Sequence, residues 1–166
     1  MTILLPDAEA LCLALADAIR PHIDPARTAL IGVHTGGVWV AERLALALRT
    51  QTPVGCIDVS YSRDDTTLNR LHVTANRTQL PFKVDGAHII IVDDVLFTGR
   101  TIRAAINEVF EYGRPGLVEL AVLVDRGSGE LPIGPTYCPQ TQLLPGATTL
   151  RLVRDETQRL SFRLVT

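Results

Sequence analysis

Residues 89–101 read IIIVDDVLFTGRT, and this stretch decides the fold. Four consecutive apolar residues are typical of a parallel strand that is covered on both faces. Two adjacent aspartates, Asp93 and Asp94, end the predicted strand, and a short turn then leads into a helix. Neighbouring carboxylates repel each other, so both stay ionised only where hydroxyl donors or a hydrated Mg²⁺ compensate them.

The turn after the two acids is suited to a phosphate group. Gly99 permits a close approach of the backbone, and Thr98 and Thr101 add hydroxyl donors. The N–H groups at the start of the following helix add an anion site. Carboxylates beside such a site match a sugar phosphate, with the acids on the ribose hydroxyls. A solvated strand end followed by a capped helix gives the same pattern, so both interpretations stay open here.

Predicted helices and strands alternate along the chain. We expect helices over 8–23, 38–50 and 100–113, and strands over 28–33, 54–62, 88–94 and 117–125, with one or two short strands within 148–165. This order predicts one α/β domain, residues 1–166, with a mostly parallel central sheet flanked by helices. Ligands bind such sheets at the carboxyl ends of the strands. The turns at 34–37, 93–101 and 125–129 should therefore rim one crevice.

Composition narrows the possible functions. Apolar residues make up 46% of the 166 residues and charged residues 20%, as in ordinary soluble globular proteins. No apolar run reaches the roughly 18–20 residues of a membrane span, and we expect a cytoplasmic protein. A net charge of −2 provides no general attraction for nucleic acid. Lys83 is the only lysine, which excludes a P-loop.

An acidic pocket of the phosphoacceptor receiver type is a competing interpretation of the two aspartates. Asp125, which ends the next predicted strand, could supply the third acid of such a pocket. A receiver also needs a lysine downstream of the acids, and none follows Lys83. This interpretation is therefore disfavoured.

The stretch IIIVDDVLFTGRTIRAA, residues 89–105, resembles the signature with which type I phosphoribosyltransferases bind phosphoribosyl diphosphate (PRPP). Further stretches, in their order along the chain, resemble the PyrR family of pyrimidine operon attenuators and uracil phosphoribosyltransferases: LIGVHTGGVWVAERLA, IDVSYSRDD, VFEYGRP and ELAVLVDRGSGELPI. The resemblance covers nearly the whole chain and implies the type I phosphoribosyltransferase fold. It also implies a hood, a mobile loop over about 61–83, a base-side segment over about 125–166 and a homo-oligomer.

The reaction implied by this resemblance converts uracil and PRPP to UMP and diphosphate, with Mg²⁺ as cofactor. Asp93, Asp94 and Arg63 would be catalytic, and the two aspartates would also lie near the metal, which PRPP would hold. Asp125 and Arg126 would lie on the base side. The remaining substrate-binding residues would be His34, Thr35, Gly36, Gly37, Asp64, Asp65, Val95, Leu96, Phe97, Thr98, Gly99, Arg100 and Thr101. In the family the loop at 34–37 often contains a cis peptide bond.

The diphosphate loop departs from the family pattern. PyrR proteins usually carry Lys-Thr-Arg-Gly there, whereas residues 34–37 of this chain read HTGG and lack both cations. Three explanations are open: backbone amides suffice, an arginine such as Arg63 compensates, or PRPP binds weakly.

A second departure concerns RNA. Attenuating family members bind messenger RNA through a basic face, and basic residues tend to follow VDRG in them. This chain has Ser128 and Gly129 there, which predicts weakened or absent RNA binding. Three hypotheses follow: a uracil salvage enzyme, an mRNA-binding attenuator that responds to pyrimidine nucleotides with little or no catalysis, and a phosphoribosyltransferase for another base, such as a purine.

Overall fold

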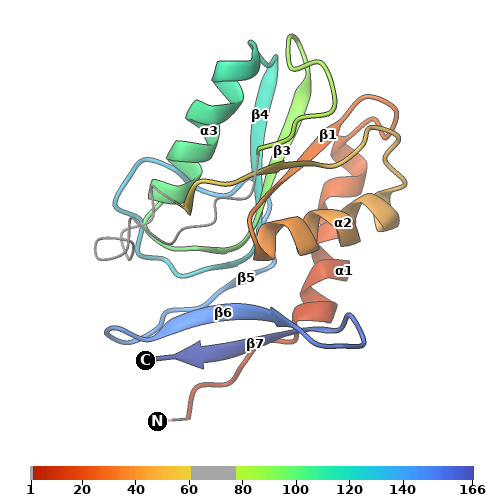
Figure 1. Cartoon of the computed structure of the whole chain (residues 1–166). Coiled ribbons are helices and arrows are strands. Elements are labelled where there is room, and N and C mark those ends of the chain that lie inside the picture. Colours follow the sequence, from red (N-terminus) through yellow and green to blue (C-terminus); the bar gives the residue numbers. More distant parts are fainter. Residues whose placement is uncertain (1, 61–77) are drawn as a thin grey trace.

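The computed structural model describes residues 2–60 and 78–166 of the chain. Within that part, a parallel sheet has the strand order β2-β1-β3-β4-β5 (Figure 1). The strands are β1 Ala29–Val33, β2 Gly55–Ile57, β3 His88–Leu96, β4 Leu117–Asp125 and β5 Gln140–Thr141. β3 pairs with both β1 and β4, so its carboxyl end lies in the middle of one edge. The predicted α/β class is confirmed.

Helices cover both faces of this sheet. They are α1 Ala8–Ile19, α2 Gly36–Leu48 and α3 Arg100–Tyr112, with a 3-10 turn, Arg20–His22, after α1. α1 and α2 pack on one face and α3 on the other (Figure 1). Ile90 and Val92 of β3 pack with α1 and α2, while Ile89 and Ile91 pack with α3. In the described part, no helix is long and apolar enough to cross a membrane.

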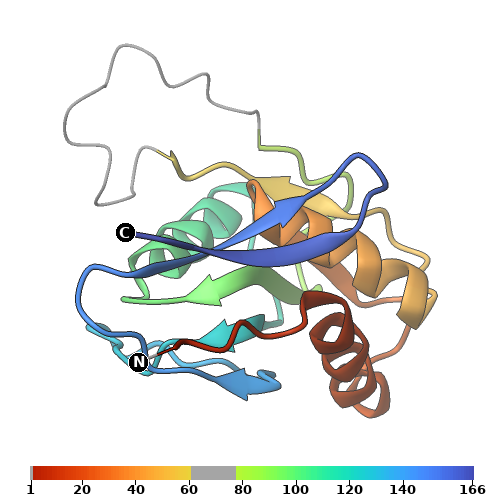
Figure 2. The same ribbon diagram turned by 90° about the horizontal axis from the view of Figure 1, so that it is seen from below.

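An antiparallel hairpin, β6 Thr149–Arg154 and β7 Leu160–Val165, forms a second, two-stranded sheet. Its buried side chains join the same core cluster as α1 and α2: Leu150, Leu152, Leu160 and Phe162. Figure 1 shows the hairpin below the central sheet, beside the lower end of α1, and Figure 2 shows it from below. The start of β6 thereby reaches the carboxyl end of β3. The prediction of one or two final strands is confirmed.

The ends of some elements differ from the predictions. α1 ends at Ile19 and not at residue 23, because Pro21 has no N–H to continue the helix and the chain tightens into a 3-10 turn. β2 covers only Gly55–Ile57 of the predicted 54–62, and residues 61 and 62 lie outside the described part. α2 begins at Gly36, two residues earlier than predicted, and β5 was not predicted.

Candidate functional site

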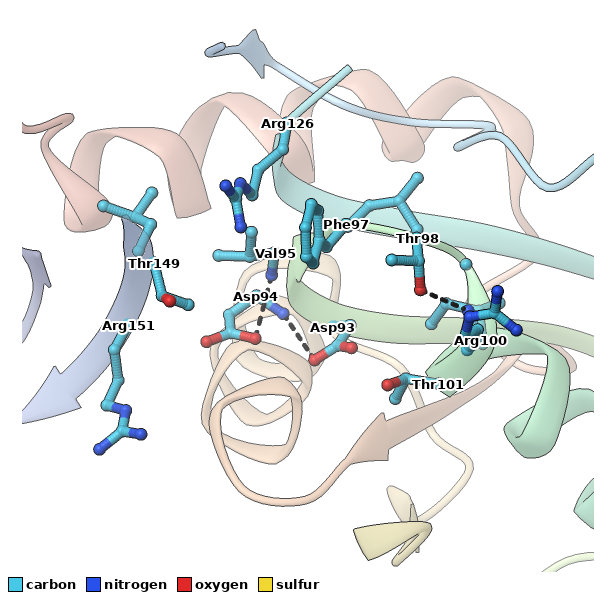
Figure 3. A pocket seen from close by; sticks show the side chains of 14 residues that line it. Asp93, Asp94, Val95, Phe97, Thr98, Arg100, Thr101, Arg126, Thr149 and Arg151 are labelled. Atoms are coloured by element: carbon cyan, nitrogen blue, oxygen red, sulfur yellow. Dashed lines mark hydrogen bonds between the residues drawn. The ribbon is translucent and has the colours of Figure 1, made fainter. Parts of the chain in front are cut away.

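A cavity of about 330 Å³ opens where β3 meets α3 (Figure 3). Its walls are formed by residues 93–102, by Arg126 after β4, and by residues 149–151 at the start of β6. The acid pair, the turn after it and the base-side arginine, which the sequence indicated separately, therefore line one cavity.

The two aspartates are held by the backbone that follows them. Asp93 is 5% exposed, and its Oδ1 accepts the Asp94 N–H at 2.9 Å. Oδ1 of Asp94 in turn accepts the Val95 N–H at 3.0 Å (Figure 3). Each bond fixes the rotation of one carboxylate. Both groups can accept hydrogen bonds from hydroxyls, as a ribose requires.

The turn at 98–101 requires glycine at position 99 because of its backbone conformation. Gly99 has φ +94°, in the left-handed region that glycine occupies without steric cost. Thr98 Oγ1 accepts the Arg100 N–H at 3.2 Å, and the Thr98 carbonyl accepts the Glu130 N–H at 3.0 Å. α3 starts at Arg100, so its first N–H groups lie at the cavity and suit an anion.

The loop at 34–37 packs directly against the acid pair. The His34–Thr35 peptide bond is cis, as the resemblance implied. A Cβ on Gly36 would lie 2.6 Å from Asp94 Oδ2, and one on Gly37 would lie 2.4 Å from the Val92 carbonyl oxygen. Glycine is required at position 37, where the neighbour is backbone, whereas a side chain at position 36 would displace the Asp94 carboxylate. The loop is therefore adjacent to Asp94, although it does not itself line the cavity.

Arg126 is a buried cation in the cavity wall. Only 5% of the residue is exposed, and its guanidinium lies 3.9 Å from the centroid of the Phe97 ring. Its Nε has no hydrogen-bond partner among the described residues, and burial lowers the pKa of the guanidinium. Asp125, its predicted base-side neighbour, does not line the cavity, and its carboxylate accepts the Gly127 N–H at 2.8 Å.

Comparison with known proteins identifies the family. Residues 5–142 match the phosphoribosyl transferase domain family. The chain is 46% identical over 159 residues to the bifunctional protein PyrR of Pseudomonas paraeruginosa, covering 94% of this chain and 89% of that protein. The chain belongs to the PyrR family of phosphoribosyltransferases. The PyrR protein of Pseudomonas syringae pv. syringae is 43% identical over 163 residues, covering 95% and 89% of the two chains.

Solved structures of other phosphoribosyltransferases share the fold of this PyrR family member. The hypoxanthine phosphoribosyltransferase of Trypanosoma cruzi matches with a TM-score of 0.69 at 20% identity, over 99% of this chain and 95% of that one. A purine phosphoribosyltransferase from Pyrococcus horikoshii matches with a TM-score of 0.61 at 23% identity, over 82% and 86%. Identity this low establishes the fold alone, and the predicted type I phosphoribosyltransferase fold is confirmed.

The resemblance implied a base-side segment over about 125–166, which includes the hairpin, but the residue pattern did not indicate which hairpin residues would reach this PyrR-family site. Thr149, Leu150 and Arg151 of β6 line the cavity, and the figure shows Arg151 on the Asp94 side (Figure 3). The alternation of apolar and polar residues in TTLRLVR predicted a strand and its buried face. The alternation did not predict which element lies beside that strand, because contacts between segments far apart in the sequence depend on tertiary packing.

Three predicted site residues, Arg63, Asp64 and Asp65, lie outside the described residues, as does most of the loop expected over 61–83. Their roles stay predictions from the resemblance. Arg100 does line the cavity, and it forms an ion pair with Glu130 at 2.7 Å.

The carboxylates of the cavity are the candidate ligands for Mg²⁺. Among residues 2–60 and 78–166, no group of three or more metal-ligating side chains could hold an ion. Mg²⁺ is usually bound by one or two carboxylates together with substrate phosphates, and it does not need an all-protein cage. The oxygens of Asp93 and Asp94 fit a Mg²⁺ that is shared with a phosphorylated substrate.

Proposed function

We propose that this chain transfers the phosphoribosyl group of PRPP to uracil, which gives UMP and diphosphate. One observation carries the proposal: the acid pair contacts the loop at 34–37 on one side and continues into the turn at 98–101 on the other. PRPP has a ribose between two phosphorylated ends, and this order of groups matches it. Membership of the PyrR family supports the choice of reaction.

Each part of the substrate has a matching group in the proposal. Asp93 and Asp94 accept the ribose hydroxyls, and the turn at 98–101 receives the 5′-phosphate. Backbone N–H groups of the loop at 34–37 receive the diphosphate. Such a site acts mainly by positioning and by electrostatic stabilisation of charge that develops in the transition state.

The reaction needs no side-chain nucleophile. N1 of uracil bonds to C1′ of the ribose, the bond from C1′ to the diphosphate oxygen breaks, and the N1 proton passes to solvent. The electron pair of the broken bond leaves with the diphosphate. When bound, Mg²⁺ would neutralise charge on the diphosphate. Asp93 and Asp94 hold the ribose in place while C1′ becomes electron-poor.

Arg126 is proposed to recognise the base. Arg126 forms no ion pair with a described residue, so its burial is costly, and a ligand that accepts its hydrogen bonds relieves that cost. Uracil has two carbonyl oxygens that can accept such bonds. The arginine is held by the Phe97 ring, so its donors are pre-oriented.

The test is diphosphate release from PRPP with Mg²⁺, measured separately with uracil, hypoxanthine, guanine and orotate. We expect release with uracil and its loss in the double variant Asp93→Asn, Asp94→Asn. Diphosphate release with a purine but not with uracil would show that the base is a purine. No release with any base, in protein that still binds UMP, would refute the catalytic proposal.

A second candidate function is RNA-binding attenuation. The relatives are named bifunctional, and the resemblance implies that messenger RNA is the second ligand. Several arginines of this chain, however, already contact carboxylates: Arg20 with Asp17, Arg43 with Glu9, Arg100 with Glu130 and Arg154 with Glu42. RNA affinity depends on cations that can reach phosphates, so titration of a pyrimidine-operon leader RNA with and without UMP tests this candidate.

A further inference from the structure

In the conformation of the loop at 34–37, the arginine that the family pattern places at position 36 would displace the Asp94 carboxylate. A Cβ on Gly36 would lie 2.6 Å from Asp94 Oδ2 and 2.8 Å from Asp94 Cγ. A larger side chain would have to displace the carboxylate. The loop residues His34, Thr35, Gly36 and Gly37 include no lysine or arginine. A protein cation that replaces the two missing ones has to come from another element of the chain, in addition to the charge that a bound Mg²⁺ would supply.

Among the described residues, three cationic side chains line the cavity, and all three are arginines. Arg100 is ion-paired with Glu130. Arg126 is buried and stacked on Phe97, which places it in the wall. Arg151 is exposed, and it has no carboxylate within 4 Å among residues 2–60 and 78–166. Its charge is thus available to a ligand in the cavity.

A second arginine stands directly beside Arg151. In the β6–β7 register, Arg151 is opposite Arg163, and directly opposite residues of an antiparallel pair have their side chains on the same face. Arg163 is also exposed, and it likewise forms no ion pair with a described residue. Two like charges directly opposite each other destabilise a hairpin. An anion bound between them would remove that penalty.

The position of Arg151 matches one end of PRPP. In Figure 3, Asp94 lies between Arg151 on one side and the residues of the phosphate turn, Thr98 and Thr101, on the other. With the ribose on the acid pair and its 5′-phosphate in the turn, C1′ and its diphosphate are the part of PRPP that is left to reach the far side of Asp94, where Arg151 lies. We propose that Arg151, supported by Arg163, binds the diphosphate of PRPP in place of the cations that are missing from the loop at 34–37. This inference rests on the proposed function.

The test compares Arg151→Met and Arg163→Met with the parent protein. Methionine keeps an unbranched apolar stem and removes the charge. The matched control is Arg27→Met, which removes an exposed charge from the turn before β1, away from the cavity. The readouts are KM for PRPP, KM for uracil, inhibition by diphosphate, and the Kd of UMP, which carries no diphosphate. PRPP binding by calorimetry without a base provides a readout that does not require turnover.

We expect Arg151→Met to raise KM for PRPP and the diphosphate inhibition constant about tenfold, with a smaller rise for Arg163→Met. The Kd of UMP and the KM for uracil should change less than about twofold, and Arg151→Lys should restore part of the PRPP affinity. Unchanged PRPP and diphosphate affinity in a folded Arg151→Met protein would overturn the inference. An equal loss of UMP affinity would also overturn it, because Arg151 would then act on the nucleotide. A parent protein that binds PRPP but releases no diphosphate would refute the proposed function alone, and calorimetry would still decide on Arg151.

Discussion

The carboxylate of Asp94 is held between two backbone segments, one at Val95 and one at Gly36. Its Oδ1 accepts the Val95 N–H at 3.0 Å, and its Oδ2 lies against Gly36, where an added Cβ would come within 2.6 Å. The orientation of a carboxylate in the site thus depends on the absence of a side chain in a different loop. A substitution at position 36 tests this dependence without changing any polar group.

Gly36→Ala is expected to lower kcat/KM by about 10- to 100-fold, because a displacement of roughly 1 Å in a positioning group can cost that much. Stability should change by less than about 1 kcal/mol, since Gly36 begins α2 and alanine is the better helix former. Steady-state kinetics and thermal unfolding measure the two effects. Gly134→Ala is the control, because a Cβ there meets no atom within 4 Å. Equal activity of both variants would contradict the positioning argument.

The two acids can also be neutralised one at a time. Asp93→Asn and Asp94→Asn each keep an oxygen that can accept the neighbouring N–H but lose the negative charge. We expect each to lower kcat/KM by about 100-fold or more, as removal of an electrostatic group in an active site commonly does. Asp85→Asn is the control, because that carboxylate accepts the Arg114 N–H outside the cavity. A fall of less than about fivefold at both acids would argue against their role on the ribose.

At the scale of elements, a polar network ties the sheet to the segment that leads into β5. His88 of β3 contacts Thr28 Oγ1 at 3.1 Å through Nδ1 and Glu119 of β4 at 2.5 Å through Nε2. The Tyr137 hydroxyl donates to the other oxygen of Glu119 at 3.2 Å. Burial, and then the charge of Glu119 and its hydrogen bond, raise the pKa of Tyr137 to about 12. These contacts hold the strand-like segment at Tyr137 beside β4.

The raised pKa gives this network a dependence on alkaline pH. The folded pKa lies above the ordinary value of 10, so the stabilisation is fully present below pH 10 and is lost as the pH rises through about 12. A shift of two pKa units corresponds to about 2–3 kcal/mol. Tyr137→Phe should be about 1 kcal/mol less stable at pH 7 and should lack this alkaline loss. Urea unfolding between pH 7 and 12 measures it, with the half-exposed Tyr112→Phe as control. Parallel pH profiles for parent and Tyr137→Phe would contradict the assignment.

The same scale explains which features were predictable from the sequence. β3 was predictable because an unbroken apolar run must be covered on both faces, and Asp93 and Asp94 end it at the edge where ligands bind. Gly99 was recognised as part of the turn, but its positive φ was seen only in the structure. The position of Arg151 at the cavity was not predictable from the residue pattern. The alternation of apolar and polar residues along β6 shows which face is buried, but it does not show which element the strand packs against. The burial of Arg126 also depends on contacts between distant segments.

At the scale of the whole molecule, polar contacts join the hairpin to the helices beside the apolar core, and the shortest of them meet at the ion pair of Glu9 with Arg43. Glu9 of α1 accepts the Leu160 N–H at 2.8 Å and binds Arg43 Nη1 of α2 at 2.5 Å. Arg43 Nη2 also donates to the Gln158 carbonyl in the turn before β7. α1, α2 and the hairpin thus meet at one carboxylate, while Arg151 of the same hairpin lines the cavity. The docking of the hairpin should therefore affect substrate affinity from a distance.

Glu9→Ala should lower stability by about 1–3 kcal/mol, because it leaves a half-buried Arg43 and the Leu160 N–H without their acceptor. Hydrogen exchange should become faster in β7, and KM for PRPP should rise severalfold although Glu9 does not line the cavity. Glu42→Ala is the matched control, because its pair with Arg154 is longer, at 3.9 Å, and more exposed, so a loss below about 1 kcal/mol is expected. Equal effects of the two variants on unfolding, or unchanged exchange in β7, would show that apolar packing alone holds the hairpin. Faster exchange without any rise in KM would instead separate the docking of the hairpin from the function of Arg151.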